Sequence, residues 1–308
     1  MSAPLFLSSG DLIADRRYDF ARDLQLRGDI AGAVDLMAQA VERAPGFASA
    51  WFALGELKQQ LNLHGEAIQA YRKAKEADPE DRHGAKLRLM RLGVETISDM
   101  PPAYVRSLFD QYAPTFEDAL VNNLNYRGPQ LLLKAVLSAC HSVKRSAFFT
   151  SAIDLGCGTG LAVRAFERNV ETFVGIDLSP GMVAKADATG LYRRLEVADM
   201  VEGVKREEDA AFDLALSADA IIYLPDLAPA LKEVARVLRP NGLAAFTTET
   251  HPGDGVVIGA GLRYAHGAAH VRGAIATAGL SLCSLEEAST RTENDVPVPG
   301  LIAVARKV

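Results

Sequence analysis

The stretch that decides the fold is Ala152-Ile-Asp-Leu-Gly-Cys-Gly-Thr-Gly160, an apolar run that leads into a glycine-rich turn. The segment 161–167 that follows has the apolar spacing of a helix. This order predicts a ligand site outside the carboxyl end of a strand, because glycines let a ligand approach bare backbone. The glycines are spaced G-x-G-x-G, with Leu161 where the dinucleotide fingerprint has its last glycine, which favours a cofactor without a pyrophosphate over NAD.

Around this stretch, short apolar runs alternate with amphipathic segments. The runs are 152–155, 172–176, 195–197, 212–216, 243–247, 280–285 and 301–304. Strands that alternate with helices predict an α/β fold with a doubly wound, mostly parallel sheet. The second run ends at Asp177, about 20 residues after the first glycine, where a carboxylate can accept from both hydroxyls of a ribose. The third leads to Asp199, from which an acid can meet an adenine amino group.

Four elements in this order, Asp154 to Gly160, Asp177, Asp199 and the Val237-Leu-Arg-Pro-Asn-Gly242 turn, resemble the class I S-adenosylmethionine-dependent methyltransferases. The resemblance covers about 104–308 and implies a Rossmann-like sheet of seven strands whose last strand is antiparallel. It also implies S-adenosyl-L-methionine as cofactor and S-adenosyl-L-homocysteine as product. By this resemblance Asp177 holds the ribose, Asp199 with Met200 borders the adenine, and Asp154 helps to hold the amino group. The implied cofactor site comprises Asp154, Gly156, Cys157, Gly158, Thr159, Gly160, Asp177, Leu178, Met182, Asp199, Met200 and Ser217.

The N-terminal third contains an internal repeat with a period of about 34 residues, over 14–47 and 48–81. The matching positions are Ala33 with Ala67, Ala40 with Ala74 and Pro45 with Pro79, and in the first copy Phe20 and Met37 supply bulk. The pattern resembles the tetratricopeptide repeat, and the whole chain resembles bacterial methyltransferases that carry such repeats ahead of the catalytic domain. Two repeats leave an apolar face to be covered, and a cap helix is expected over 81–92. We therefore expect a helical repeat domain over 1–98.

The segment 99–145 is helical in pattern and rich in aromatic residues, and the catalytic domain is expected over 146–308. The aromatic segment is a candidate lid, in which Tyr112 or Tyr126 and Arg127 close over the cofactor and contact the substrate. A closed lid would keep water out of the site. Ordinary packing of these side chains is the alternative.

The loop after the fourth expected strand contains Asp219 and Tyr223, which are expected beside the transferred methyl group and are the first two catalytic candidates. Helix capping by Asp219 and core packing by Tyr223 are the alternatives. The loop lacks the Asn/Asp-Pro-Pro-Tyr signature of many amino and amide methyltransferases, which disfavours amide and adenine-N6 acceptors. A general base is needed only where the acceptor still holds its proton.

Histidines and arginines gather after the fifth expected strand, and His266 is the third catalytic candidate. If a helix begins near His266, then His266 and His270 share a face, but the residues between them do not form a metal motif. We expect no metal. The candidates for binding an anionic or phenolic substrate are Arg263 and His270 together with His266 and Arg272, since arginine forks match carboxylates. Arg291 and Glu293 could join them. Helix capping and surface solvation are the alternatives for the first four, and a charged surface loop is the alternative for Arg291 and Glu293.

The charge and the cysteines limit the class of partner. The formal net charge is −6, which argues against a surface built to neutralise phosphates, so no nucleic acid partner is expected. Three scattered cysteines fit a reducing compartment, and no segment resembles a signal peptide or a membrane span, so we expect a cytoplasmic protein without a membrane partner.

The sequence thus predicts a methyltransferase acting on a small anionic or phenolic acceptor, at oxygen or another non-amide atom, with repeats that are structural or self-associating. A methyltransferase whose protein or carrier-protein substrate is recruited by the repeats is the first alternative. A non-enzymatic interaction protein with a cofactor-binding scaffold is the second.

Overall fold

The computed structural model describes residues 5–118, 120 and 124–308, and the chain divides into two compact units, Met1–Gln111 and Tyr112–Val308. The helix α6 (Pro102–Tyr112) crosses this division, within the segment expected to be a lid or linker. Part of that segment, 119 and 121–123, lies outside the described residues. None of the described helices combines the length and the hydropathy that a membrane span requires.

The first unit consists of two antiparallel helix pairs and a further helix, as the repeat predicts. The helices are α1 (Leu12–Leu26), α2 (Ile30–Arg43), α3 (Ala48–Gln60), α4 (His64–Ala77) and α5 (Ala85–Arg91). The repeated alanines are at most 3% exposed, since they lie where two helices touch. A Cβ on Gly55 would lie 2.6 Å from the ring of Tyr71, so only glycine lets these helices approach so closely.

The N-terminal strap, residues 5–9, forms no helix or strand and lies against the helices of the first unit. The backbone N–H of Leu7 donates to Ser49 Oγ at 2.8 Å, and the ring of Phe6 lies 5.2 Å from that of Tyr18 and 5.9 Å from that of Phe47. The strap covers part of the apolar face that two repeats leave open. Phe20, expected to supply bulk, is 62% exposed, because the buried face of α1 passes through Tyr18 instead.

The second unit is built on a sheet in the order β3-β2-β1-β4-β5-β11-β8. The strands are β1 (Phe149–Leu155), β2 (Val170–Asp177), β3 (Arg194–Val197), β4 (Phe212–Ser217), β5 (Leu238–Glu249), β8 (Leu280–Glu287) and β11 (Gly300–Lys307). All seven expected strands are present. The strand β11 lies between β5 and β8 and is antiparallel to both, which confirms the Rossmann-like arrangement. The reversal of strand order between β1 and β4 places the ligand site at the carboxyl ends of these strands.

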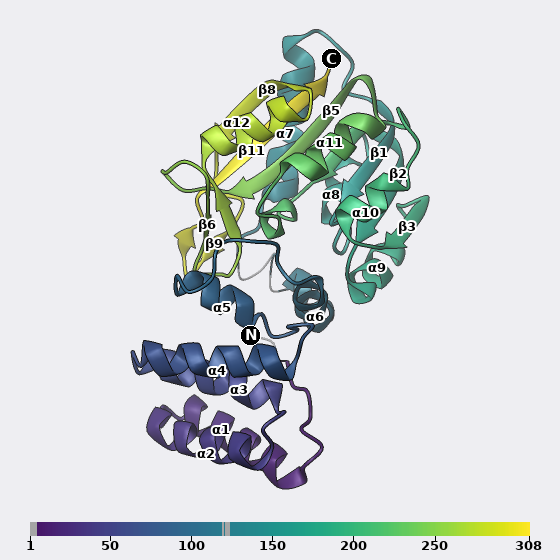
Figure 1. Cartoon of the computed structure of the whole chain (residues 1–308). Helices are drawn as coiled ribbons and strands as arrows, with labels where there is room; N and C mark the ends of the chain where they lie inside the picture. The colour runs from purple at the N-terminus through teal and green to yellow at the C-terminus, as the bar shows by residue number, and fades with distance from the viewer. Residues whose placement is uncertain (1–4, 119, 121–123) are drawn as a thin grey trace. The chain divides into compact units, whose positions relative to one another are not determined.

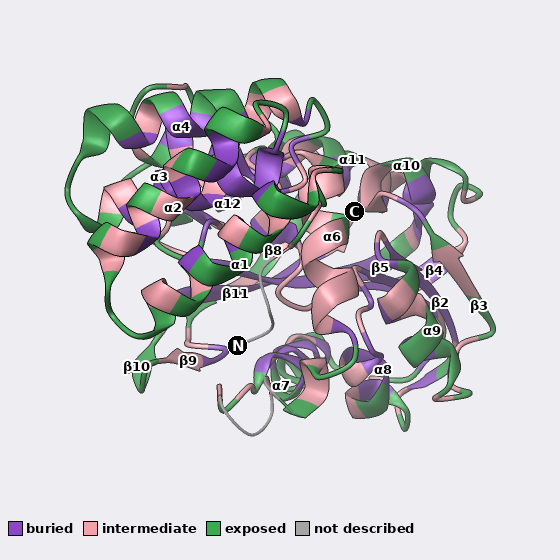
Figure 2. Cartoon of the chain, turned by 90° about the horizontal axis from the view of Figure 1, so that it is seen from below, coloured by how far each residue is buried: buried purple, intermediate pink, exposed green. Residues whose placement is uncertain are grey.

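Helices cover both faces of this sheet (Figure 1). Residues of α10 (Met200–Lys205), α11 (Ala228–Val237) and α12 (Ala268–Thr277) pack on one face, and those of α7 (Gly128–Ser142) and α8 (Leu161–Phe166) on the other. Figure 2 shows the central strands β4, β5 and β11 buried between these layers. The sequence did not predict the short strands β6 (Val256–Ile258) and β7 (Tyr264–His266), which extend the sheet beside β5, or the hairpin of β9 (Thr292–Glu293) and β10 (Val296–Pro297).

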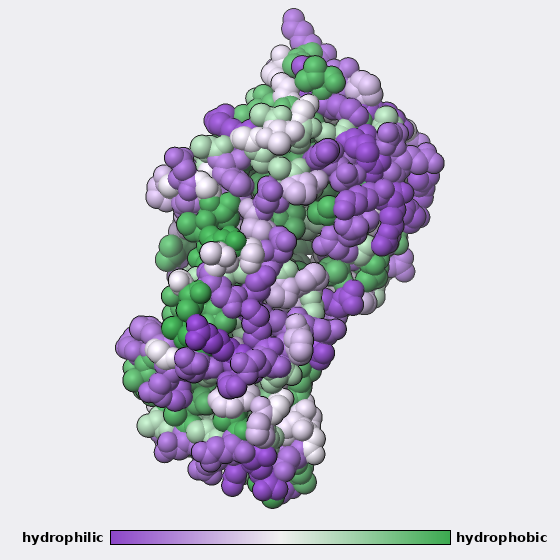
Figure 3. Space-filling view, viewed as in Figure 1, coloured by the Kyte–Doolittle hydropathy of each residue, from purple (hydrophilic) through white to green (hydrophobic). Residues whose placement is uncertain are grey.

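The exposed surface over β3 and α10 carries charges of both signs. Arg194 and Arg206 pair with Glu196, and Lys205 pairs with Glu202 at 2.6 Å. Figure 3 shows this side of the second unit as largely hydrophilic. Because each charge faces its opposite, this surface is not a patch of a single sign.

Candidate functional site

The glycine turn that follows β1 needs all three of its glycines. Gly156, Gly158 and Gly160 have φ values of +67°, +53° and +87°, in the left-handed region that favours glycine. A Cβ on Gly156 would lie 2.2 Å from Cβ of Ala220, whereas at Gly158 the nearest atom would be a ring carbon of Phe116 at 3.9 Å. The turn therefore packs tightly against the loop after β4 at Gly156 and has more space at Gly158. Space at Gly158 suits a ligand that approaches the backbone of the turn.

Asp177 ends β2 and braces this turn. Its Oδ2 accepts a hydrogen bond from the N–H of Gly158 at 2.8 Å, and its Oδ1 accepts from the N–H of Ser179 at 2.9 Å. The hydroxyl of Ser179 caps the helix α9 (Pro180–Asp187) through the N–H of Met182. A carboxylate can accept about four hydrogen bonds, so bracing the turn is compatible with holding a ribose.

Two buried polar atoms at the turn have no hydrogen-bond partner among the described residues. They are Oδ1 of Asp154, a residue that is 1% exposed, and Oγ1 of Thr159, which is 2% exposed. Burial raises the pKa of Asp154 to about 7, against a hydrogen bond that Tyr192 donates to its Oδ2 at 2.8 Å. Unpartnered buried groups are costly and mark places where a ligand completes the bonding. The turn therefore fits a cofactor with hydrogen-bonding groups.

The remaining cofactor candidates occupy different positions. Asp199 caps α10 through the N–H groups of Val201 and Glu202, and Cε of Met200 comes within 3.8 Å of where a Cβ on Gly156 would lie. Around the turn, Cys157 and Met182 are buried and Leu178 is half-buried. The adenine contact of Asp199 stays a prediction.

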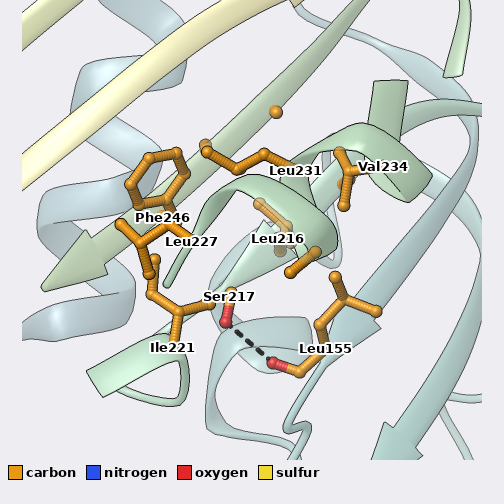
Figure 4. A pocket seen from close by; sticks show the side chains of 12 residues that line it. Leu155, Leu216, Ser217, Ile221, Leu227, Leu231, Val234 and Phe246 are labelled. Carbon is orange, nitrogen blue, oxygen red and sulfur yellow. Dashed lines mark hydrogen bonds between the residues drawn. The ribbon is translucent and has the colours of Figure 1, made fainter. Parts of the chain in front are cut away.

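Ser217 differs from the expectation. Ser217 is 3% exposed, and its hydroxyl donates to the carbonyl oxygen of Leu155 at 3.0 Å. Both residues line a small apolar cavity between α11 and the sheet, which Figure 4 shows together with Leu231 and Phe246. Because its hydroxyl bonds to a buried carbonyl beside this cavity, Ser217 is part of the interior here.

Asp219 is held on every side. It has a φ of +53°, its Oδ1 accepts from Thr247 Oγ1 at 2.5 Å, and its Oδ2 accepts from Thr290 Oγ1 at 2.7 Å and from Arg291 Nη1 at 2.8 Å. Asp219 is therefore no helix cap. Three donors already use the carboxylate, so it serves as an anchor for the loop that contains Thr290 and Arg291.

Arg291 lies at the centre of an ion network formed by Asp219, Glu249, Arg263, Arg291 and Glu293. Its Nη2 pairs with Glu249 and its Nε lies 3.2 Å from Glu293 Oε1. Arg263 pairs with the same two glutamates, through Nε at 2.5 Å from Glu249 Oε1 and through Nη2. Burial acts to lower the pKa of Arg291, but the acidic partners raise it above its ordinary value. Tyr223 is near enough to raise the pKa of both arginines.

This network changes the expectation for Arg263. A substrate-binding arginine offers its fork to the ligand, whereas two carboxylates of the chain itself contact this one. Arg291, expected as a surface charge or a member of the substrate site, is 6% exposed and ties the loop after β8 to β4 and β5. The sequence held no local signal for this, because Arg291 and Asp219 are 72 residues apart.

His266 is inside the protein. It is 0% exposed, its Nε2 lies 2.9 Å from the carbonyl oxygen of Leu224, and its Nδ1 lies 2.6 Å from Thr248 Oγ1. The carbonyl can only accept, so Nε2 carries a proton. Burial lowers its pKa to about 4. With both nitrogens used by the interior, the structure does not place His266 where it could take a proton from an acceptor.

The helix expected from His266 begins two residues later, at Ala268. His270 lies in its first turn and stacks on His266 with ring centroids 5.5 Å apart, so the two rings meet from a strand and a helix and do not share one helical face. Nε2 of His270 is buried without a hydrogen-bond partner in the part of the chain that is described. Arg272 is exposed on α12.

The aromatic segment lies beside the turn and the network. Phe116 approaches Gly158, and Glu117 pairs at 3.0 Å with Arg164 of α8. Nearer to α7, the N–H of Arg127 donates to the carbonyl of Thr290 at 2.7 Å. Burial raises the pKa of Tyr126 well above its ordinary value, with the charges of Asp219, Arg291 and Asp154 also acting on it. Tyr112, at the end of α6, is half-buried; its contact with a substrate stays a prediction.

Arg127 itself is exposed. Within the described residues its guanidinium donates one long hydrogen bond, from Nη2 to the carbonyl of Ser289 at 3.3 Å. Its fork is thus used less by the protein than the forks of Arg263 and Arg291.

Comparisons with known proteins agree with this geometry. A family model described as a methyltransferase domain matches residues 153–246, and a model described as a tetratricopeptide repeat matches residues 24–89. The chain is 31% identical over 172 residues to methyltransferase-like protein 27 of Homo sapiens, covering 54% of this chain and 67% of that protein. It is 36% identical over 100 residues to the malonyl-[acyl-carrier protein] O-methyltransferase of Salmonella typhimurium, covering 32% of this chain and only 39% of that protein.

Among solved structures, the 1,6-didemethyltoxoflavin-N1-methyltransferase of Burkholderia thailandensis, with bound 1,6-didemethyltoxoflavin and S-adenosylhomocysteine, is 16% identical. The likeness has a TM-score of 0.51 and covers 70% of this chain and 93% of that one. The two proteins share the fold.

Proposed function

The chain belongs to the S-adenosylmethionine-dependent methyltransferases, with a tetratricopeptide-type repeat unit ahead of the catalytic unit, and on this basis we propose that it methylates a small anionic or phenolic acceptor at oxygen. Bound S-adenosylmethionine supplies a sulfonium methyl for in-line displacement. The residues that would hold it are those of the glycine turn, Asp154 and Asp177. The task left to the protein is to align the acceptor and to exclude water, and alignment can supply about 7–11 kcal/mol.

The state of Asp219 carries this proposal. A general base must have a lone pair within reach of the acceptor proton. Three of the about four hydrogen bonds that the carboxylate of Asp219 can accept come from Thr247, Thr290 and Arg291, and both nitrogens of His266 are engaged in the interior. An acceptor whose oxygen is already ionised needs no base. A carboxylate is ionised near neutral pH and therefore fits best, ahead of a phenol.

An anionic acceptor also needs a cation. Arg263 is paired with Glu249 and Glu293, whereas the exposed Arg127 makes a single long hydrogen bond. The backbone N–H of Arg127 donates to the carbonyl of Thr290, and the hydroxyl of Thr290 donates to Asp219 in the loop after β4, so Arg127 lies near the end of that strand. We therefore assign the acceptor carboxylate to Arg127.

The test is a methyl-transfer assay with a panel of carboxylates, phenols of matched size and amines. Carboxylates should be methylated, and Arg127→Gln should raise their KM roughly tenfold or more, as expected for a lost charge-assisted contact. Cofactor affinity by calorimetry should stay unchanged. Arg168→Gln, an exposed arginine after α8, is the matched control. Preferred methylation of amines, or an unchanged KM in Arg127→Gln, would contradict the proposal.

A carrier-linked acid is the second candidate. It is favoured by the similarity to enzymes named malonyl-[acyl-carrier protein] O-methyltransferase, which extends over 96–156 residues in four relatives. Its test is the ratio of kcat/KM for one acid presented free and on a carrier protein, measured with the full chain. A ratio near one would leave the small-molecule acceptor as the substrate.

A further inference from the structure

Tyr192 reaches from the loop between α9 and β3 to the base of the glycine turn. Its hydroxyl donates to Oδ2 of Asp154 at 2.8 Å, although the two residues are 38 positions apart. Asp154 is 1% exposed, and within the described residues its other oxygen, Oδ1, has no hydrogen-bond partner. The carboxylate is therefore fixed at one oxygen and unsatisfied at the other.

The ring of Tyr192 is fixed as firmly as its hydroxyl. It packs edge-on against Phe173 of β2, with ring centroids 6.3 Å apart. A Cβ on Gly175 would lie 2.7 Å from this ring, and one on Gly160 would lie 3.3 Å from it. Two glycines thus admit the ring, one in β2 and one at the end of the glycine turn. These contacts hold Tyr192 in one rotamer, and its hydroxyl in turn holds the carboxylate of Asp154 in one orientation.

We propose that Tyr192 is a positioning residue for the cofactor: it fixes Asp154 through Oδ2 so that Oδ1 remains as the acceptor for the ammonium group of the cofactor's methionine part. The family resemblance implied that Asp154 helps to hold the amino group, but it gave no reason for the acid to hold one orientation. This proposal rests on the cofactor alone and is independent of which acceptor is methylated.

The charge state of Asp154 adds a pH dependence. The groups that act on it are Tyr192, Asp177, Cys157 and Tyr126. Burial raises the pKa of Asp154, the charge of Asp177 raises it further, and the hydrogen bond from Tyr192 lowers it, with a net value of about 7. Removing the hydroxyl raises this pKa, so the acid ionises only at higher pH. An ammonium is attracted by the ionised form, so binding should need a higher pH in a variant without the hydroxyl.

The experiment is isothermal titration of the full chain and of Tyr192→Phe, which keeps the ring and removes the hydroxyl. Two ligands are compared: S-adenosylhomocysteine, which carries the ammonium, and methylthioadenosine, which lacks the amino-acid part. Near neutral pH, Tyr192→Phe should bind S-adenosylhomocysteine about tenfold more weakly, in line with one hydrogen bond to a charged group. The loss should shrink toward about pH 9 as Asp154 ionises. Methylthioadenosine should bind equally to both proteins.

A second variant, Asp154→Asn, closes a double-mutant cycle. Once Asp154 has lost its charge, Tyr192→Phe should cause no further loss of S-adenosylhomocysteine affinity, because the hydroxyl acts through the carboxylate. Equal weakening of both ligands would show a merely structural role for Tyr192 and overturn the proposal. Additive losses in the double variant, or unchanged binding of S-adenosylhomocysteine in Tyr192→Phe, would overturn it as well.

Discussion

Removal of the Arg291 side chain should destabilise the catalytic unit more than removal of any surface arginine. The side chain of Arg291 is 7% exposed, and the side chains of its partners Asp219 and Glu249 are 13% and 11% exposed. Arg291→Ala leaves the largely buried carboxylate of Asp219 without its arginine partner and leaves Glu249 with Arg263 alone. Breaking a buried ion pair by removing one partner costs about 3–5 kcal/mol. Glu293 is 37% exposed and adds little, because water screens it.

We therefore expect a loss of about 3–4 kcal/mol, a large part of the about 5–15 kcal/mol by which a domain is stable. The matched control is Arg206→Ala, which removes a pair with Glu196 whose arginine side chain is 61% exposed. That pair should contribute about 0–1 kcal/mol. Arg291→Lys should recover part of the loss, since an ammonium keeps the charge but not the three-way fork.

Urea unfolding can be followed separately in the two units, because the single tryptophan, Trp51, lies in the repeat unit. Tryptophan fluorescence then follows the repeat unit, and circular dichroism follows both units. The Arg291→Ala shift should occur in the transition that fluorescence does not report. A loss no larger than that of Arg206→Ala, or a shift confined to the Trp51 transition, would refute the reasoning.

Two further predictions concern the turn and the buried imidazole. Gly156→Ala should abolish cofactor binding in calorimetry, because the new Cβ would clash with Ala220. The control Gly190→Ala has the same φ of +67° but lies in open space, so this variant should still bind the cofactor. Equal cofactor affinities of the two variants would refute the steric argument. Burial lowers the pKa of His266 to about 4. An unfolded histidine titrates near about 6.5, so between these values the unfolded state binds more protons and stability falls as the pH drops. In His266→Gln, the contribution of this histidine to the fall in stability should disappear from the unfolding of the catalytic unit. The repeat unit should keep its own fall in stability, since burial also lowers the pKa of His83 to about 4. A pH profile unaltered in both units would contradict the burial of a neutral His266.

The sequence predicted what depends on local pattern. The glycine spacing, the strand runs and Asp177 at the end of the second run are features of a few consecutive residues, and all appear in the structure where they were expected. The two repeats follow for the same reason, because each small residue lies where two helices of one pair touch.

What the sequence missed depends on pairs that are distant along the chain. Nothing near Asp219 indicates Arg291, and nothing near Asp154 indicates Tyr192, since each partner comes from a loop whose path is set by the whole sheet. His266 shows the opposite difficulty. A histidine beside arginines resembles a site in the sequence, but its strand β7 turns it into the interior.

The N-terminal strap has a consequence for the order of synthesis. Residues 5–9 leave the ribosome before Ser49, which accepts a hydrogen bond from the backbone of Leu7 and follows it by 42 residues. Until α3 has been made, the strap and the ring of Phe6 have nothing to pack on except α1. The strap ahead of the first repeat therefore reaches its final packing only after the second repeat has been synthesised. The repeat unit should gain its full resistance to proteolysis only when both repeats have emerged.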